Sequence, residues 1–163
     1  MRMKRSYLIA AIAAAAAGTA LHFLYEVFPN LISALLSPVN ESVWEHLKLL
    51  FWPMLAAALV LSARAPCRIR TWSGFLAALL AMPAFLLALY YLLRAVGVAG
   101  TAVDIGLYCL TMLAGFWLAW YLQKNGKLAK HTGILLMLVI LYGSSLILFT
   151  FAAPPLPIFT PNA

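Results

Sequence analysis

The side chains that could do chemistry in this sequence are few, and most lie in two short stretches. One is PVNESVWEH, at residues 38–46, and the other is HFLYE, at residues 22–26. The chain has only four acidic residues and three histidines, and imidazole and carboxylate groups together suit zinc, manganese or iron. The sequence therefore predicts a divalent metal site, whose first-choice ligands are His22, Glu26, Glu45 and His46 and whose second choices are Glu41 and Asp104.

Known catalytic motifs do not narrow this chemistry further. SVWEH, at residues 42–46, has the spacing of the inverted zincin motif HxxEH, but Ser42 stands where the first histidine would be. This departure argues against a standard zinc protease. The sequence also has no GxSxG nucleophile motif, no glycine-rich phosphate loop and no CxxCH haem motif. His22 and His46 could in principle hold a haem, and the reaction, if there is one, stays open.

The composition of the chain shows what kind of scaffold must position these groups. The sequence has 163 residues, of which 66% are hydrophobic and 9% are charged, whereas a soluble domain has roughly 25% charged residues. The net charge of +7 comes from short basic clusters between apolar segments, so it indicates membrane topology and not a nucleic-acid partner. The expected partner is the lipid bilayer.

Five segments are long and apolar enough to cross a membrane as helices. A span needs about 20 apolar residues, and a helix is the structure that satisfies its own backbone in lipid. The sequence therefore predicts an all-α integral membrane bundle in a single domain, 1–163, with Pro83 as a kink in the third span. The five predicted spans are 6–28, 42–63, 71–96, 101–122 and 132–151.

The distribution of basic residues predicts the orientation of the bundle. Nine of the eleven lysines and arginines lie before the first span, between the second and third spans, or between the fourth and fifth. Because cytoplasmic segments carry an excess of Lys and Arg, the N-terminus is predicted to be cytoplasmic and the C-terminus extracytoplasmic. A competing interpretation is that residues 1–20 form a cleaved signal peptide, but the apolar stretch continues through Leu24, which favours a retained helix.

With this orientation, all four acidic residues and two of the three histidines fall on the extracytoplasmic side. His22 and Glu26 are four residues apart, so they are expected to share a helix face. That face continues through Gly18 and Ala14, small residues that allow close packing within one chain or in a homo-oligomer. The sequence thus predicts an outward-facing polar pocket, lined in addition by Tyr25, Tyr90, Arg94, Tyr108, Tyr142 and Ser145.

These side chains also have a purely structural interpretation. Glu41 and Glu45 lie where a helix begins, and Ser42 with Glu45 fits a capping box. Asp104 also lies at a helix start, and Arg94 is expected to form a salt bridge with one of the acids. Three functions therefore stay open: a metal site used for hydrolysis or sensing, a small cation- or proton-coupled transporter subunit, and a structural membrane protein. The inner halves of the spans have few polar residues, which favours a one-sided site over a transport path.

Three motifs of this chain resemble those of a known family. They are HFLYE at 22–26, PVNESVWEHLKLLFWP at 38–53 and FTFAAPPLPIF at 149–159, and together they are similar to a family of small multi-spanning bacterial membrane proteins of unknown function. The resemblance implies a multi-pass protein of a bacterial plasma membrane and carries no assigned activity. The proline-rich segment after Ala153 is expected to be stiff and extended, and it could lie across the mouth of the pocket.

Overall fold

The computed structural model describes residues 5–161, and every regular element in that part of the chain is a helix. Arg2 and Lys4, two of the residues used to predict the orientation, lie outside it. In chain order the elements are α1 (Arg5–His22), α2 (Leu24–Val27), α3 (Leu31–Leu36), α4 (Val43–Ala63), α5 (Arg68–Ala95), α6 (Thr101–Asn125), the 3₁₀ helix η1 (Lys127–His131), α7 (Thr132–Phe151) and the 3₁₀ helix η2 (Pro157–Phe159).

Among residues 5–161, five helices are long and apolar enough to cross a membrane, as predicted. The last predicted span, 132–151, coincides with α7, whereas α5 begins at Arg68 instead of residue 71 and α6 continues to Asn125. These helices extend past their apolar segments because Arg and Lys can keep their charged ends in water while their stems cover apolar surface. Pro83 lies within α5, which continues on both sides of it.

The first span, predicted at residues 6–28, is confirmed at Arg5–Val27, but the helix within it is interrupted. α1 ends at His22, and α2 begins at Leu24. In a continuous helix the Tyr25 N–H would donate to the Leu21 carbonyl, but here the Ser37 hydroxyl stands between them. It accepts from Tyr25 N at 3.3 Å and donates to Leu21 O at 2.5 Å. A side chain inserted into the helical ladder is a recognised cause of a kink.

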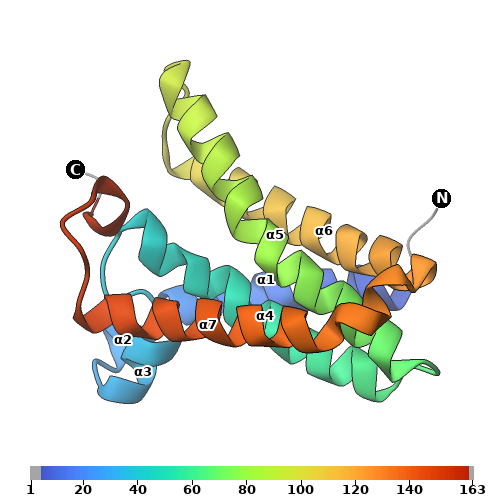
Figure 1. The fold of residues 1–163 in the computed structure, drawn as a ribbon. Coiled ribbons are helices and arrows are strands. Elements are labelled where there is room, and N and C mark those ends of the chain that lie inside the picture. Colours follow the sequence, from blue (N-terminus) through green and yellow to red (C-terminus); the bar gives the residue numbers. More distant parts are fainter. Residues whose placement is uncertain (1–4, 162–163) are drawn as a thin grey trace.

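The short helix α3 was not predicted. It begins after Pro29, with Asn30 as its N-cap. In a capping box, the Asn30 side chain accepts from Ser33 N at 3.0 Å and the Ser33 hydroxyl accepts from Asn30 N at 3.1 Å. α3 lies beside α2 at the end of the bundle where α7 also ends (Figure 1), and its Ala34 carbonyl accepts from Lys48 in the second turn of α4. This short helix supplies part of the surroundings of the candidate site.

The five long helices pack around a core to which α1, α4, α5, α6 and α7 all contribute. Within the core, Phe75 of α5 stacks on Tyr7 of α1 and meets Phe116 of α6 edge to face, with ring centroids 5.5 and 5.7 Å away. α5 and α6 form a hairpin whose connecting end projects away from the other helices (Figure 1). α1 approaches α4 and α6 closely at Gly18, where an added Cβ would lie 2.7 Å from the Leu49 carbonyl oxygen.

The segment after α7 folds back and does not stay extended throughout, which corrects the expectation for the proline-rich tail. It forms the 3₁₀ turn η2, and the Phe159 ring lies 4.9 Å from Trp44 and 5.2 Å from Phe149. Pro161 forms an isolated antiparallel bridge with Ser42. Burial of aromatic surface explains why the tail turns toward α4.

Candidate metal centre

The structure brings His22, Glu41 and His46 together at one end of the bundle. One potential ligand atom from each residue lies within 4.8 Å of the other two. His22 is the last residue of α1, Glu41 precedes α4, and His46 is in the first turn of α4. Between residues 5 and 161, this is the one group of three or more such side chains that could hold a metal ion.

His46 is oriented as a metal-binding histidine would be. Its Nδ1 lies 2.8 Å from the Ser42 carbonyl oxygen, which can only accept a hydrogen bond, so Nδ1 carries the proton. Nε2 is therefore the nitrogen left to bind a metal, and it lies 3.4 Å from Glu41 Oε2. A carbonyl that fixes the second nitrogen in this way is the usual support for a metal-ligating histidine.

His22 completes the group from a different helix. Its ring centroid lies 5.3 Å from that of His46, and its Nδ1 is buried without a hydrogen-bond partner among the described residues. Buried polar atoms are nearly always paired, so an unpaired imidazole nitrogen beside a second imidazole and a carboxylate suggests a missing ligand partner. The break at Phe23 ends α1 at this histidine, and the Phe23 ring meets the His22 ring edge to face, with centroids 5.0 Å apart.

Glu41 keeps the group open to its surroundings. Its side chain is 64% exposed, and that of His46 is 32% exposed. Glu41 lies before the first residue of α4, and the N-cap of α4 is Ser42, whose hydroxyl accepts from Glu45 N at 3.3 Å. Only this half of the predicted capping box forms, because the Glu45 carboxylate points elsewhere.

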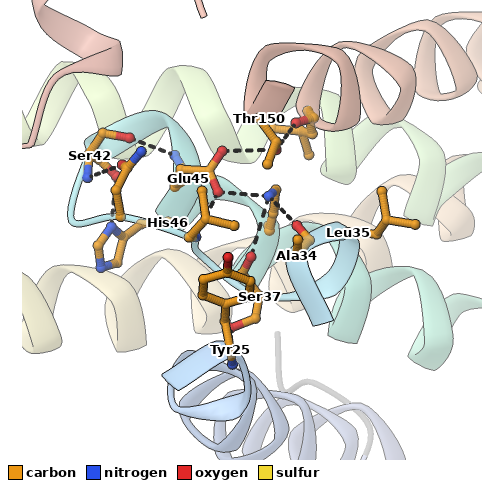
Figure 2. A network of polar contacts seen from close by, with 12 residues as sticks. Tyr25, Ala34, Leu35, Ser37, Ser42, Glu45, His46 and Thr150 are labelled. Carbon is orange, nitrogen blue, oxygen red and sulfur yellow. Dashed lines mark hydrogen bonds and ion pairs between the residues drawn. The ribbon is translucent and has the colours of Figure 1, made fainter. Parts of the chain in front are cut away.

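Glu45 belongs to a separate, buried ion pair with Lys48 (Figure 2). The Glu45 Oε2 to Lys48 Nζ distance is 2.7 Å, and the two side chains are 3% and 0% exposed. Glu45 Oε2 also accepts from Val39 N at 3.0 Å, and Oε1 accepts from the Thr150 hydroxyl of α7 at 3.0 Å. Both carboxylate oxygens are therefore engaged by protein donors.

The ammonium of Lys48 is equally well satisfied. Besides Glu45, it donates to the carbonyls of Ala34 at 2.8 Å and Ser37 at 3.3 Å. These carbonyls belong to α3 and the residue that follows it, so the ion pair connects α3, α4 and α7 (Figure 2). Sequence reasoning did not assign this function to Lys48, although its spacing of three residues from Glu45 on a helix is the signal for such a pair.

The other residues of the predicted pocket lie in different places. Glu26 is exposed and is not part of the His22 group. Arg94 pairs with Asp104 at 2.9 Å, as expected for an arginine beside these acids, and its guanidinium lies 4.9 Å from the centre of the Tyr90 ring. This pair lies where α5 and α6 meet, on the projecting hairpin (Figure 1).

The tyrosines and the serine that were predicted to line the pocket do not converge on one site, as their hydrogen bonds show. Tyr108 donates to the Ala15 carbonyl at 3.1 Å and so connects α6 to α1. Ser145 donates to the Tyr142 carbonyl at 2.7 Å, while the Tyr142 hydroxyl is buried with no partner in the described part of the chain. Tyr25 contacts Ser37 through its backbone. The predicted pocket is thus divided into a His–Glu–His group, a buried ion pair and an exposed ion pair.

The fold and this geometry together define a class: an all-helical chain with five helices able to cross a membrane and a His–Glu–His group near one end of the bundle. The chain belongs to a family of unknown function, DUF6512, whose model matches residues 1–163. The resemblance to an uncharacterised family is thereby confirmed. No curated protein and no solved structure matches the chain.

Proposed function

We propose that this protein is a multi-pass protein of a bacterial plasma membrane and that it binds one divalent metal ion through His22, Glu41 and His46. Zinc is the first candidate for this ion. The observation that carries the proposal is the orientation of His46. Its Nδ1 donates to the Ser42 carbonyl at 2.8 Å, so its Nε2 faces the Glu41 carboxylate at 3.4 Å. The buried, unpaired Nδ1 of His22 beside this pair supports it.

The donor set suits a reactive site better than a purely structural one. Two histidines and one carboxylate are three protein ligands, the number found in catalytic zinc sites, which keep a fourth position for water or substrate. The exposure of Glu41 leaves room for that position. A bound ion would lower the pKa of its water toward neutrality and make it a nucleophile or a sensing position. Manganese and iron are the alternative ions for the same ligands.

The position of the group favours a one-sided site over a transport path. It lies at the end of the bundle opposite the one where α1 begins, α4 leads into α5 and α6 leads into η1 (Figure 1), and that opposite end has most of the basic residues between 5 and 161. The excess of positive charge at that far end supports a cytoplasmic location for it, and we infer from this that the metal site faces outward. No second group of potential ligands, which a conduction path would need, occurs among residues 5–161.

Zinc titration of the purified full-length protein tests this proposal. The wild-type chain should bind one ion per chain, and binding should weaken in acid because protons compete for the imidazoles. His46→Ala and His22→Ala should each lower the affinity by at least about 10–100-fold, the effect of losing even an outer-shell support. His131→Ala is the matched control, because His131 is exposed at the opposite end of the bundle.

Circular dichroism of each variant shows whether the helices persist, so that a loss of binding can be separated from a loss of fold. The proposal is wrong if the folded wild-type protein binds no zinc, manganese or iron. It is also wrong if His131→Ala weakens binding as much as His46→Ala does.

A further inference from the structure

A groove of about 690 Å³ lies at the basic end of the bundle, opposite the candidate metal centre. Its walls are the last turn of α4, the first turns of α5 and the start of α7. The polar lining residues are Ser62, Arg68 and Thr132, and the apolar ones include Leu59, Ile69 and Trp72. A charged and polar end therefore meets an apolar side within one groove.

Ser62 is the first sign that the groove binds a ligand. The residue is 3% exposed, it lines the groove, and its hydroxyl has no hydrogen-bond partner in the part of the chain that the structure describes. A helical serine commonly satisfies its hydroxyl on the carbonyl of the preceding turn. A buried hydroxyl that does not do so indicates a donor left for a ligand.

Positive potential converges on the same place. Arg68 is exposed and forms no ion pair within residues 5–161. It is also the first residue of α5, a helix of 28 residues whose N-cap, Cys67, makes no side-chain capping hydrogen bond. The N-terminus of a helix carries partial positive charge and free N–H groups, which favour an anion such as phosphate.

The apolar side of the groove indicates that the anion is attached to a hydrocarbon chain. Leu59 and Ile69 are 57% and 52% exposed, and both lie on helices long and apolar enough to span a membrane. Trp72 is half-buried one turn further along α5, and tryptophan is enriched at the level of lipid headgroups. A free phosphate ion would use only the polar end.

We propose that this groove binds an anionic phospholipid, with Arg68, Ser62 and the first turn of α5 holding the headgroup phosphate and with an acyl chain along Leu59, Ile69 and Trp72. Basic pockets between transmembrane helices at the cytoplasmic side have the chemistry that recognises such headgroups. The occupant is distinct from the metal, and the groove is at the other end of the bundle, so neither proposal depends on the other.

Native mass spectrometry of the full-length protein in detergent, titrated with phosphatidylglycerol or phosphatidylcholine, tests the proposal. The protein should retain one phosphatidylglycerol in preference to phosphatidylcholine. Arg68→Gln should lower the phosphatidylglycerol affinity about ten-fold or more, and Ser62→Ala, which does not change the charge, about five-fold. The matched controls are Arg64→Gln, four residues before Arg68 at the end of α4, and Ser144→Ala, on the exposed face of α7, both expected to change it by no more than about two-fold.

Four outcomes would overturn the inference. Equal losses for Arg64→Gln and Arg68→Gln would show diffuse attraction of anionic lipid to the basic end. An unchanged affinity in Ser62→Ala would show that the Ser62 hydroxyl does not contact the lipid. Equal retention of the two lipids would show that the groove does not select for an anionic headgroup. Displacement of phosphatidylglycerol by millimolar inorganic phosphate would show that the site takes the free ion. Arg68→Lys keeps the charge and should restore part of the affinity, which separates a binding defect from misfolding.

Discussion

Replacing Lys48 by methionine should destabilise the bundle by about 3–5 kcal/mol, the usual cost of removing one partner of a buried ion pair. The substitution removes the ammonium and retains an unbranched apolar side chain that fills most of the same space. Glu45 would then be a buried carboxylate without its cation. The carbonyls of Ala34 and Ser37 would also lose the donors that they now have at 2.8 and 3.3 Å.

The size of this destabilisation depends on the buried groups that remain after the Lys48 ammonium is removed. Glu45 would keep Val39 N and the Thr150 hydroxyl as donors, so its charge would be hydrogen-bonded but not neutralised. Each unpaired buried carbonyl would add to the cost by about 1–3 kcal/mol if no water reached it. Glu45→Gln in the Lys48→Met background removes the buried charge, so the double variant should be more stable than the sum of the single effects by about 1 kcal/mol or more.

Reversible unfolding of the full-length protein in mixed micelles, followed by far-ultraviolet circular dichroism, measures these differences. Arg94→Gln is the matched control, because it also breaks an ion pair but one whose side chains are 32% and 42% exposed; exposed pairs contribute little. A loss below about 1 kcal/mol for Lys48→Met, or strictly additive effects in the double variant, would refute the view that this pair holds α3 and α7 onto α4.

Two further predictions concern the packing around the site. Gly18→Ala should destabilise the protein in the same unfolding assay, because the new Cβ would lie 2.7 Å from a backbone carbonyl of α4, whereas Gly133→Ala meets nothing within 4 Å; equal effects of the two would contradict the close approach of α1. Truncation after Ala153 should shift the Trp44 fluorescence to longer wavelength, since it removes the Phe159 ring, whose centroid lies 4.9 Å from that of the indole; an unchanged spectrum would show that the tail does not cover it.

The five long helices could be predicted from the sequence because a membrane leaves an apolar segment little alternative to a helix. α7 coincides with its predicted range, 132–151. The break at Phe23 could not be predicted from the residues around it. It depends on the Ser37 hydroxyl, which reaches the Leu21 carbonyl from 16 positions along the chain. The same contact ends the helix face that His22 and Glu26 were expected to share.

The types of residue in the candidate site could be predicted from the sequence, but the particular glutamate beside the histidines could not. His22 and His46 were expected together because both fall at the same end of neighbouring spans, and their rings lie 5.3 Å apart. The glutamate beside them is Glu41 and not Glu45, and the reason is the position at which α4 begins. Because the helix starts at Val43, Glu41 lies in the preceding loop and can turn toward the histidines.

Glu45 and His46 are adjacent in sequence but face different parts of the structure. Successive residues of a helix point about 100° apart, so Glu45 faces α3 and α7 while His46 faces α1. Ser42 connects the two sets of contacts, because its hydroxyl accepts from Glu45 N and its carbonyl holds His46 Nδ1. The start of α4 thus contributes both to the buried ion pair and to the candidate metal ligands. A metal ion bound by His22, Glu41 and His46 would also fasten α1 to α4, so by linkage it should stabilise the folded bundle.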